Sequence, residues 1–274
     1  MEDVFVGTEA VASGALTRGQ LRWSYRRMFP DVYSTNAAEP QLPQRILGAW
    51  LWSKRQGVIA GAAAAVLHGA RPVNQGVDVE LIWRCSRPPH GIRVRNERIE
   101  ADEITEIDGL PVTRLERTAL DLARHAPRDS AVVHLDALAR ATGLTASEVE
   151  PLLNRYRGSR AIWHAIEAVS LMDGGSSSPR ETLTRLALSD AGFPAPKTDF
   201  TVTDGGGSTR VAMGYDAPMV GVVFGEDSSG MQEKAGWRLI SAADATPPAI
   251  MCKVRMTVTE RGYPLWRLQR LSRV

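Results

Sequence analysis

Hydrophobic and polar residues follow both strand and helix periods along this chain. Alternation over Val77–Trp83 predicts a strand, whereas Leu115, Ala119, Leu122 and Ala123 recur at helical spacing. On that helix Glu116 and Asp121 lie opposite the apolar face, so both are expected to be surface acids. Further helices are predicted over 44–55, 61–68, 130–141, 146–156, 161–171, 179–191 and from 247 onward, and further strands over 91–99, 198–202, 210–214, 219–224 and 237–241. The pattern predicts a multidomain protein of the α+β or α/β class.

The first 35 residues have the order of a small helical unit with a β excursion. A short helix is predicted over Thr8–Ser13, and Thr17 is a suitable N-cap for a second helix over 18–27. Val32 and Tyr33 then follow as a small β element. Two helices followed by a β excursion are typical of a winged helix-turn-helix.

Arginines recur along the second predicted helix. Arg18, Arg22 and Arg26 are spaced four apart and would share one face, with Arg27 beside them. Such a stripe suits contacts with DNA phosphates and grooves, so these four residues are the predicted DNA-binding residues. The alternative is an ordinary solvated helix face.

Polar and glycine-rich stretches suggest where the domains divide. Residues 36–43 are polar and contain two prolines, and 173–178 (DGGSSS) is the clearest linker. The predicted division is therefore a winged helix-turn-helix over 1–35, a mixed α/β region over 44–172, and a C-terminal domain over 179–274.

The C-terminal domain has the predicted order helix, three-stranded meander, further strand, helix, which is the order of the PD-(D/E)xK nuclease core. It resembles the very-short-patch-repair-type endonuclease-like domain that follows AbiEi-type winged-helix antitoxin domains. The stretches that carry the resemblance are SSSPRETLTRLALSDAGFPAP (176–196), RVAMGYDAPMVGVVFGED (210–227), AGWRLISA (235–242) and VRMTVTERGY (254–263), with GVIAGAAAAVLHG (57–69) and GLPVTRLERTALDLAR (109–124) upstream. The resemblance implies a restriction-endonuclease-like fold for the C-terminal domain.

In that family three carboxylates hold a divalent ion, and this sequence keeps one of them. The resemblance places Glu181 at the first-helix position, Ala212 at the second-strand position and Val223 at the third-strand position. Mg²⁺ requires oxygen ligands, which alanine and valine side chains lack. We therefore expect a degenerate metal site, with no catalytic residue.

Only an active nuclease would need substitutes for the missing acids. Asp216 and Glu226 are near in sequence, but each is displaced from the usual place. Glu181 itself has a second interpretation, because Ser178-Pro179-Arg180-Glu181 fits a helix capping box. We expect that structural role for Glu181.

Composition narrows the remaining choices. Lys and Arg number 33 against 31 Asp and Glu, so a net charge of +2 does not by itself demand a polyanionic partner. The two cysteines, Cys85 and Cys252, have no Cys or His at metal-ligand spacing, and no apolar run is long enough to span a membrane. We expect no bound metal or cofactor, with Mg²⁺ only for an active nuclease, no membrane partner, and a cytoplasmic protein.

The basic C-terminal stretch, 255–273, has two interpretations. Its arginines and the aromatic residues Tyr263 and Trp266 suit nucleic acid, whereas Leu265, Leu268 and Leu271 suit a helix packed on the domain. The second interpretation is preferred.

These observations favour a DNA-binding regulatory protein resembling an antitoxin or transcriptional repressor, with a nuclease-like domain that does not cleave. Its expected partner is double-stranded DNA, and a cognate toxin is the second candidate. The alternatives are an active metal-dependent endonuclease of the very-short-patch-repair type, and a toxin-neutralising interaction module without DNA binding.

Overall fold

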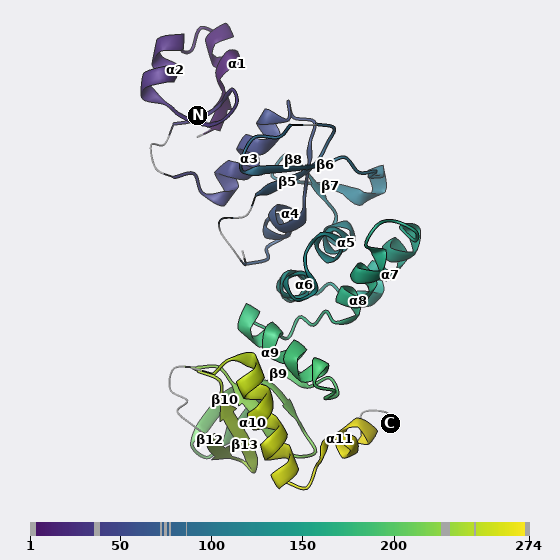
Figure 1. Cartoon of the computed structure of the whole chain (residues 1–274). Coiled ribbons are helices and arrows are strands. Elements are labelled where there is room, and N and C mark those ends of the chain that lie inside the picture. The colour runs from purple at the N-terminus through teal and green to yellow at the C-terminus, as the bar shows by residue number, and fades with distance from the viewer. Residues whose placement is uncertain are drawn as a thin grey trace. The chain divides into compact units, whose positions relative to one another are not determined.

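A computed structural model of the chain describes residues 4–35, 39–71, 73, 76, 78–85, 87–225, 231–243 and 245–271. The chain forms two compact units (Figure 1). The first comprises Met1–His125 and Ala146–Val169, and the second comprises Ala126–Thr145 and Ser170–Val274. Both contain helices and strands, so the predicted mixed multidomain class is confirmed at that level.

The first unit begins with a small sheet and two short helices. Strand β1 (Val4–Val6) leads into α1 (Gly7–Ala12), then α2 (Arg18–Ser24) and the antiparallel hairpin of β2 (Arg26–Phe29) and β3 (Val32–Ser34). The strands pair in the order β1-β3-β2. The predicted elements therefore exist, but the second helix is shorter than expected.

Local chemistry fixes both ends of α2. Thr17 and Gln20 form a reciprocal capping box at its start. At its end Tyr25 has extended backbone angles, and its ring packs edge-on against that of Phe5, with 5.2 Å between the ring centroids. The prediction that Arg26 and Arg27 lie on this helix is therefore wrong: both lie on β2.

A second, five-stranded sheet completes the first unit. Its strand order is β6-β5-β4-β8-β7, with β4 parallel to β8 and β5 parallel to β6. The strands are β4 (Val58–Ala60), β5 (Val79–Ile82), β6 (Ile92–Arg95), β7 (Ile104–Ile107) and β8 (Leu110–Thr113). The helices are α3 (Leu42–Trp52), α4 (Gly61–Leu67), α5 (Leu115–His125), α7 (Ala146–Arg155) and α8 (Ile162–Ser170), with the 3₁₀ turn η1 (Ala101–Glu103) before β7.

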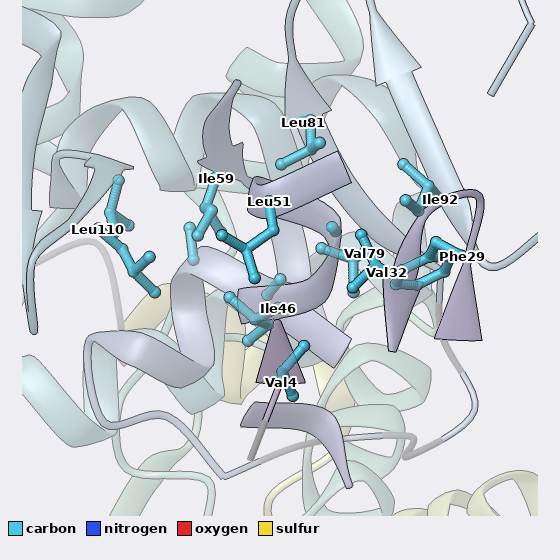
Figure 2. Packing of buried hydrophobic residues seen from close by; sticks show 14 residues of the cluster. Val4, Phe29, Val32, Ile46, Leu51, Ile59, Val79, Leu81, Ile92 and Leu110 are labelled. Carbon is cyan, nitrogen blue, oxygen red and sulfur yellow. The ribbon is translucent and has the colours of Figure 1, made fainter. Parts of the chain in front are cut away.

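One hydrophobic core joins the two sheets of the first unit. Val4 and Val32 of the small sheet and Val79 of the larger one belong to the same buried cluster as Ile46 and Leu51 of α3 (Figure 2). Residues 4–34 therefore share a buried core with the larger sheet, and the winged helix-turn-helix domain over 1–35 stays a prediction. Helix α3 supplies apolar residues to both sheets because its buried positions cover more than one face.

The second unit is built on a five-stranded sheet in the order β12-β13-β11-β10-β9. Strands β9, β10 and β11 form an antiparallel meander, and β11 then runs parallel to β13. The elements are α6 (Arg128–Thr142), α9 (Pro179–Asp190), β9 (Lys197–Asp204), β10 (Gly207–Tyr215), β11 (Val220–Val223), β12 (Met231–Lys234), β13 (Trp237–Ser241), α10 (Pro247–Glu260) and α11 (Leu265–Leu271).

Helices α9, α10 and α11 share a core with this sheet. Leu188, Ile250 and Leu268 are buried with Met213 and Ile240. Because Leu268 is buried and Leu265 packs beside it, the interpretation of the basic tail as a packed helix is confirmed for those two residues. The side chain of Leu271 lies outside the described residues.

The segment expected to be a linker, 173–178, is packed within the second unit. Asp173 accepts hydrogen bonds from the Thr198 hydroxyl, and its backbone N–H donates to Asp136 of α6 at 2.8 Å. Arg140 of α6 donates to the carbonyl oxygens of Gly174 and Gly175. These bonds tie α6 to the unit, although it precedes the expected boundary by some thirty residues. Within the described residues, no helix is both long and apolar enough to cross a membrane.

Candidate functional site

Glu181 lies at the position where the resemblance places a metal ligand, and an arginine occupies its carboxylate. Arg210 of β10 donates from Nη1 to Glu181 Oε1 at 2.9 Å and from Nη2 to Glu181 Oε2 at 3.1 Å. Its Nε donates to Asp199 of β9 at 2.6 Å, and Arg140 donates to the other Asp199 oxygen at 3.0 Å. Two carboxylates and two guanidiniums thus form a continuous chain of ion pairs, from Glu181 through Arg210 and Asp199 to Arg140.

The start of α9 positions Glu181. Ser178 is the N-cap and accepts a hydrogen bond from the Glu181 backbone N–H at 3.3 Å, and Pro179 occupies the first helical position. The Glu181 carboxylate accepts from the backbone N–H and the hydroxyl of Ser177, each at 2.8 Å. The capping bond is therefore as expected, but the reciprocal arm reaches Ser177 and not Ser178.

The environment of Glu181 favours its ionised form. Burial alone raises the pKa of this carboxyl group, but hydrogen bonds from Arg210 and Ser177 outweigh burial and hold the pKa below its ordinary value. The same contacts, with Asp199, raise the pKa of Arg210 well above its usual range. Both groups are charged at neutral pH, and their contacts with each other satisfy that charge.

The predicted site positions that the structure describes supply no partner carboxylate for Glu181. Ala212 and Val223 are buried apolar residues. The Asp216 side chain is 64% exposed and lies 3.6 Å from Lys197 Nζ, whereas Glu226 lies outside the described residues. Because Arg210 takes both oxygens of Glu181, these residues do not fit a divalent ion of the kind that the nuclease fold implies.

The pairing of Arg210 with Glu181 was not predicted from the sequence. Its one available signal was an arginine two residues before Ala212, at the start of the stretch RVAMGY. A strand position gives no indication of which helix residue a long side chain will reach. The pairing with Glu181, 29 residues earlier, depends on how α9 packs against β10.

A basic surface in the first unit carries the predicted DNA-binding residues that remain exposed. Arg18 and Arg22 lie four apart on α2, and Arg27 lies on β2; all three are exposed. Trp23 on α2 is 82% exposed, and the Arg22 guanidinium lies 5.5 Å from the Trp23 ring centroid. Within the part of the chain that the structure describes, Arg18, Arg22 and Arg27 have no acidic partner.

Arg26 differs from the other three. Its guanidinium lies 3.2 Å from Glu39 Oε2, and its side chain is 38% exposed. Arg26 and Arg27 line a cleft of about 730 Å³ together with Arg45, His90 and the acids Glu39 and Asp78. The mixture of charges along this cleft is less suited to a phosphate chain than the α2 surface.

The chain is similar to known proteins whose function has not been assigned. The chain is 30% identical over 183 residues to two uncharacterized proteins of Mycobacterium tuberculosis, MT2308 of strain CDC 1551 / Oshkosh and Rv2248 of strain ATCC 25618 / H37Rv. The aligned region spans 66% of this chain and 66% of the length of each relative. No family model and no solved structure matches the chain.

Proposed function

We propose that this protein is a DNA-binding regulatory protein whose second unit has a nuclease-like core but does not cleave DNA. The observation that carries the proposal is the basic surface of Arg18 and Arg22 on α2: these two residues, and Arg27 on β2, are exposed and have no acidic partner among the described residues. Unneutralised arginines on one small unit attract phosphates and release counterions from DNA.

The elements around this surface support a winged-helix mode of binding. Helices α1 and α2 precede the β2–β3 hairpin, as the two helices and the wing do in that motif. Helix α2 would enter the major groove, with Arg18 and Arg22 directed at phosphates or base edges. Arg27, on β2, would contact the neighbouring backbone, and Trp23 adds a flat apolar surface.

The second unit supports the nuclease-like part of the proposal through its topology. Helix α9, the antiparallel meander β9–β11 and a later strand, β13, parallel to β11 follow the order of the PD-(D/E)xK core, with the additional strand β12 between β11 and β13. The ion pair of Arg210 with Glu181 weighs against cleavage, because a guanidinium already satisfies the carboxylate that would hold a metal.

A gel-shift comparison tests the proposal. The full chain is titrated against the DNA upstream of its own gene and against a random duplex of equal length, at about 0.15 M salt. We expect at least tenfold tighter binding to the upstream DNA, because groove contacts add to the phosphate term. Equal affinity for both duplexes contradicts a regulatory role.

A further inference from the structure

Three side chains of the first unit form a cluster that neither the sequence reasoning nor the proposed function uses. Asp121 and His125 lie four apart on α5, and Glu97 lies in the segment between β6 and η1. One ligand atom from each of the three lies within 4.8 Å of the other two. Asp121 was expected to be a surface acid, but it is 1% exposed and pairs with the buried Arg117.

Each of the two carboxylates accepts a hydrogen bond from an arginine on one of its oxygens. Arg117 Nε donates to Asp121 Oδ1 at 3.0 Å, and Arg124 Nη1 donates to Glu97 Oε2 at 2.9 Å. The other oxygens, Asp121 Oδ2 and Glu97 Oε1, receive neither of these bonds. The arginines therefore act as outer partners that orient the carboxylates, as groups behind metal ligands do.

Two of the remaining atoms are buried without a hydrogen bond. Asp121 Oδ2 belongs to a side chain with no exposed surface, and no described group donates to it. His125 Nε2 makes no hydrogen bond among the described residues, but it lies 3.0 Å from Glu97 Oε1, an ion-pair distance when the imidazole is protonated. Buried polar atoms in folded proteins are nearly always satisfied, so Asp121 Oδ2 above all points to a missing partner.

The charges around the cluster favour a cation as that partner. The connected network contains the guanidiniums of Arg117, Arg124 and Arg155 and the carboxylates of Glu97, Asp102, Glu103 and Asp121. Four carboxylates face three guanidiniums, so the network carries one net negative charge when His125, which also contacts Glu97, is neutral, as it must be to bind a metal.

Two of the three side chains are partly exposed, although the ligand atoms of Asp121 and His125 are buried. The side chains of Glu97 and His125 are 24% and 18% exposed, respectively, whereas Asp121 forms the buried floor. Ligands bonded at about 2.0–2.2 Å to one ion lie about 3–3.5 Å apart, so the cluster needs to close by little more than 1 Å. Rotamer adjustments of the exposed pair supply movements of that size.

We propose that Glu97 Oε1, Asp121 Oδ2 and His125 Nε2 bind a divalent transition-metal ion. One imidazole nitrogen and two carboxylate oxygens are ligands that suit Zn²⁺ and its neighbours in the first transition series. With three protein ligands, the ion keeps at least one position for water. The inference is independent of DNA binding and of the nuclease-like unit.

Metal titration of the full chain tests this proposal. After chelator treatment, Zn²⁺ binding is measured by calorimetry and Co²⁺ binding by visible absorption, for the wild type, His125→Ala, Asp121→Asn and His164→Ala. His164 is the matched control, because it is an exposed histidine of the same unit. We expect one Zn²⁺ per chain, at least tenfold weaker binding in His125→Ala and Asp121→Asn, and wild-type binding in His164→Ala.

Thermal unfolding separates loss of a ligand from loss of fold. Metal-free His125→Ala is expected to melt cooperatively, and Zn²⁺ is expected to raise the Tm of the wild type but not of this variant. The proposal is overturned if the wild type shows no saturable binding at one ion per chain. Unchanged Zn²⁺ affinity in a folded His125→Ala variant overturns it equally.

Discussion

Arg210 donates two hydrogen bonds to Glu181, one to each carboxylate oxygen, at 2.9 and 3.1 Å. A protein-borne cation thus occupies the carboxylate at which a nuclease of this type would hold a metal. Ala212 and Val223, at the positions where the resemblance would place acids, likewise offer no metal ligand.

The ion pair predicts a pH-dependent contribution of Glu181 to stability. Because the pKa of Glu181 is below its ordinary value of 4.5, the contribution is fully present above about pH 4.5 and is lost as the pH falls through the folded-state pKa. Glu181→Gln is expected to lower the free energy of unfolding by about 1–3 kcal/mol at pH 7 and by less near pH 3. Urea unfolding at both pH values measures the difference.

Asp216→Asn is the matched control, because its side chain is 64% exposed. We expect a change within about 0.5 kcal/mol. A Glu181→Gln variant as stable as this control at pH 7 would show that Arg210 and Glu181 do not stabilise the unit.

Plasmid cleavage distinguishes the degenerate nuclease from an active one. Supercoiled plasmid incubated with the protein and Mg²⁺ or Mn²⁺ is expected to stay intact, because the paired Glu181 offers no free oxygen and Ala212 and Val223 offer none. Gel electrophoresis records the outcome. Metal-dependent cleavage that disappears in Glu181→Ala would show that the domain is an active endonuclease.

The contacts of Asp136 predict that α6 contributes to the stability of the second unit. It is 1% exposed and accepts hydrogen bonds from Thr182 and Arg185 of α9, each at 2.8 Å. Asp136→Ala removes the closer carboxylate partner of the buried Arg185 and leaves it only Asp173 at 3.8 Å, so we expect a loss of about 3–5 kcal/mol in chemical denaturation. Asp129→Ala, on the exposed side of the same helix, serves as control and is expected to cost less than about 1 kcal/mol.

Sequence patterns predicted most helices and strands because periodicity and caps are local. Thr17 marked the start of α2, and Ser178 and Pro179 marked the start of α9. The end of α2 was missed because the packing of Tyr25 on Phe5, a contact twenty residues apart, favours the extended conformation. Tertiary contacts decided that boundary.

The ion pairs at the two candidate sites could not be predicted from the sequence, because they depend on how distant elements pack. Asp121 lies opposite the apolar positions of α5 and was expected at the surface, yet it is buried and pairs with Arg117, which also contacts Glu97. Arg210 meets Glu181 only after α9 has packed on the sheet. In both cases the residue types were visible in the sequence, but their spacing along the chain does not show which of them meet.

The salt dependence of DNA binding tests the central claim most directly. Dissociation constants for the upstream duplex are measured by fluorescence anisotropy across a series of salt concentrations, for the wild type, Arg18→Ala/Arg22→Ala and Arg157→Ala. Arg157 is an exposed arginine of α7's C-terminal turn and serves as control. We predict that the double variant lowers the slope of log K against log salt by about 2, since each phosphate contact contributes about 0.9, and that Arg157→Ala leaves it unchanged. Equal slopes for the wild type and the double variant would contradict DNA binding through α2.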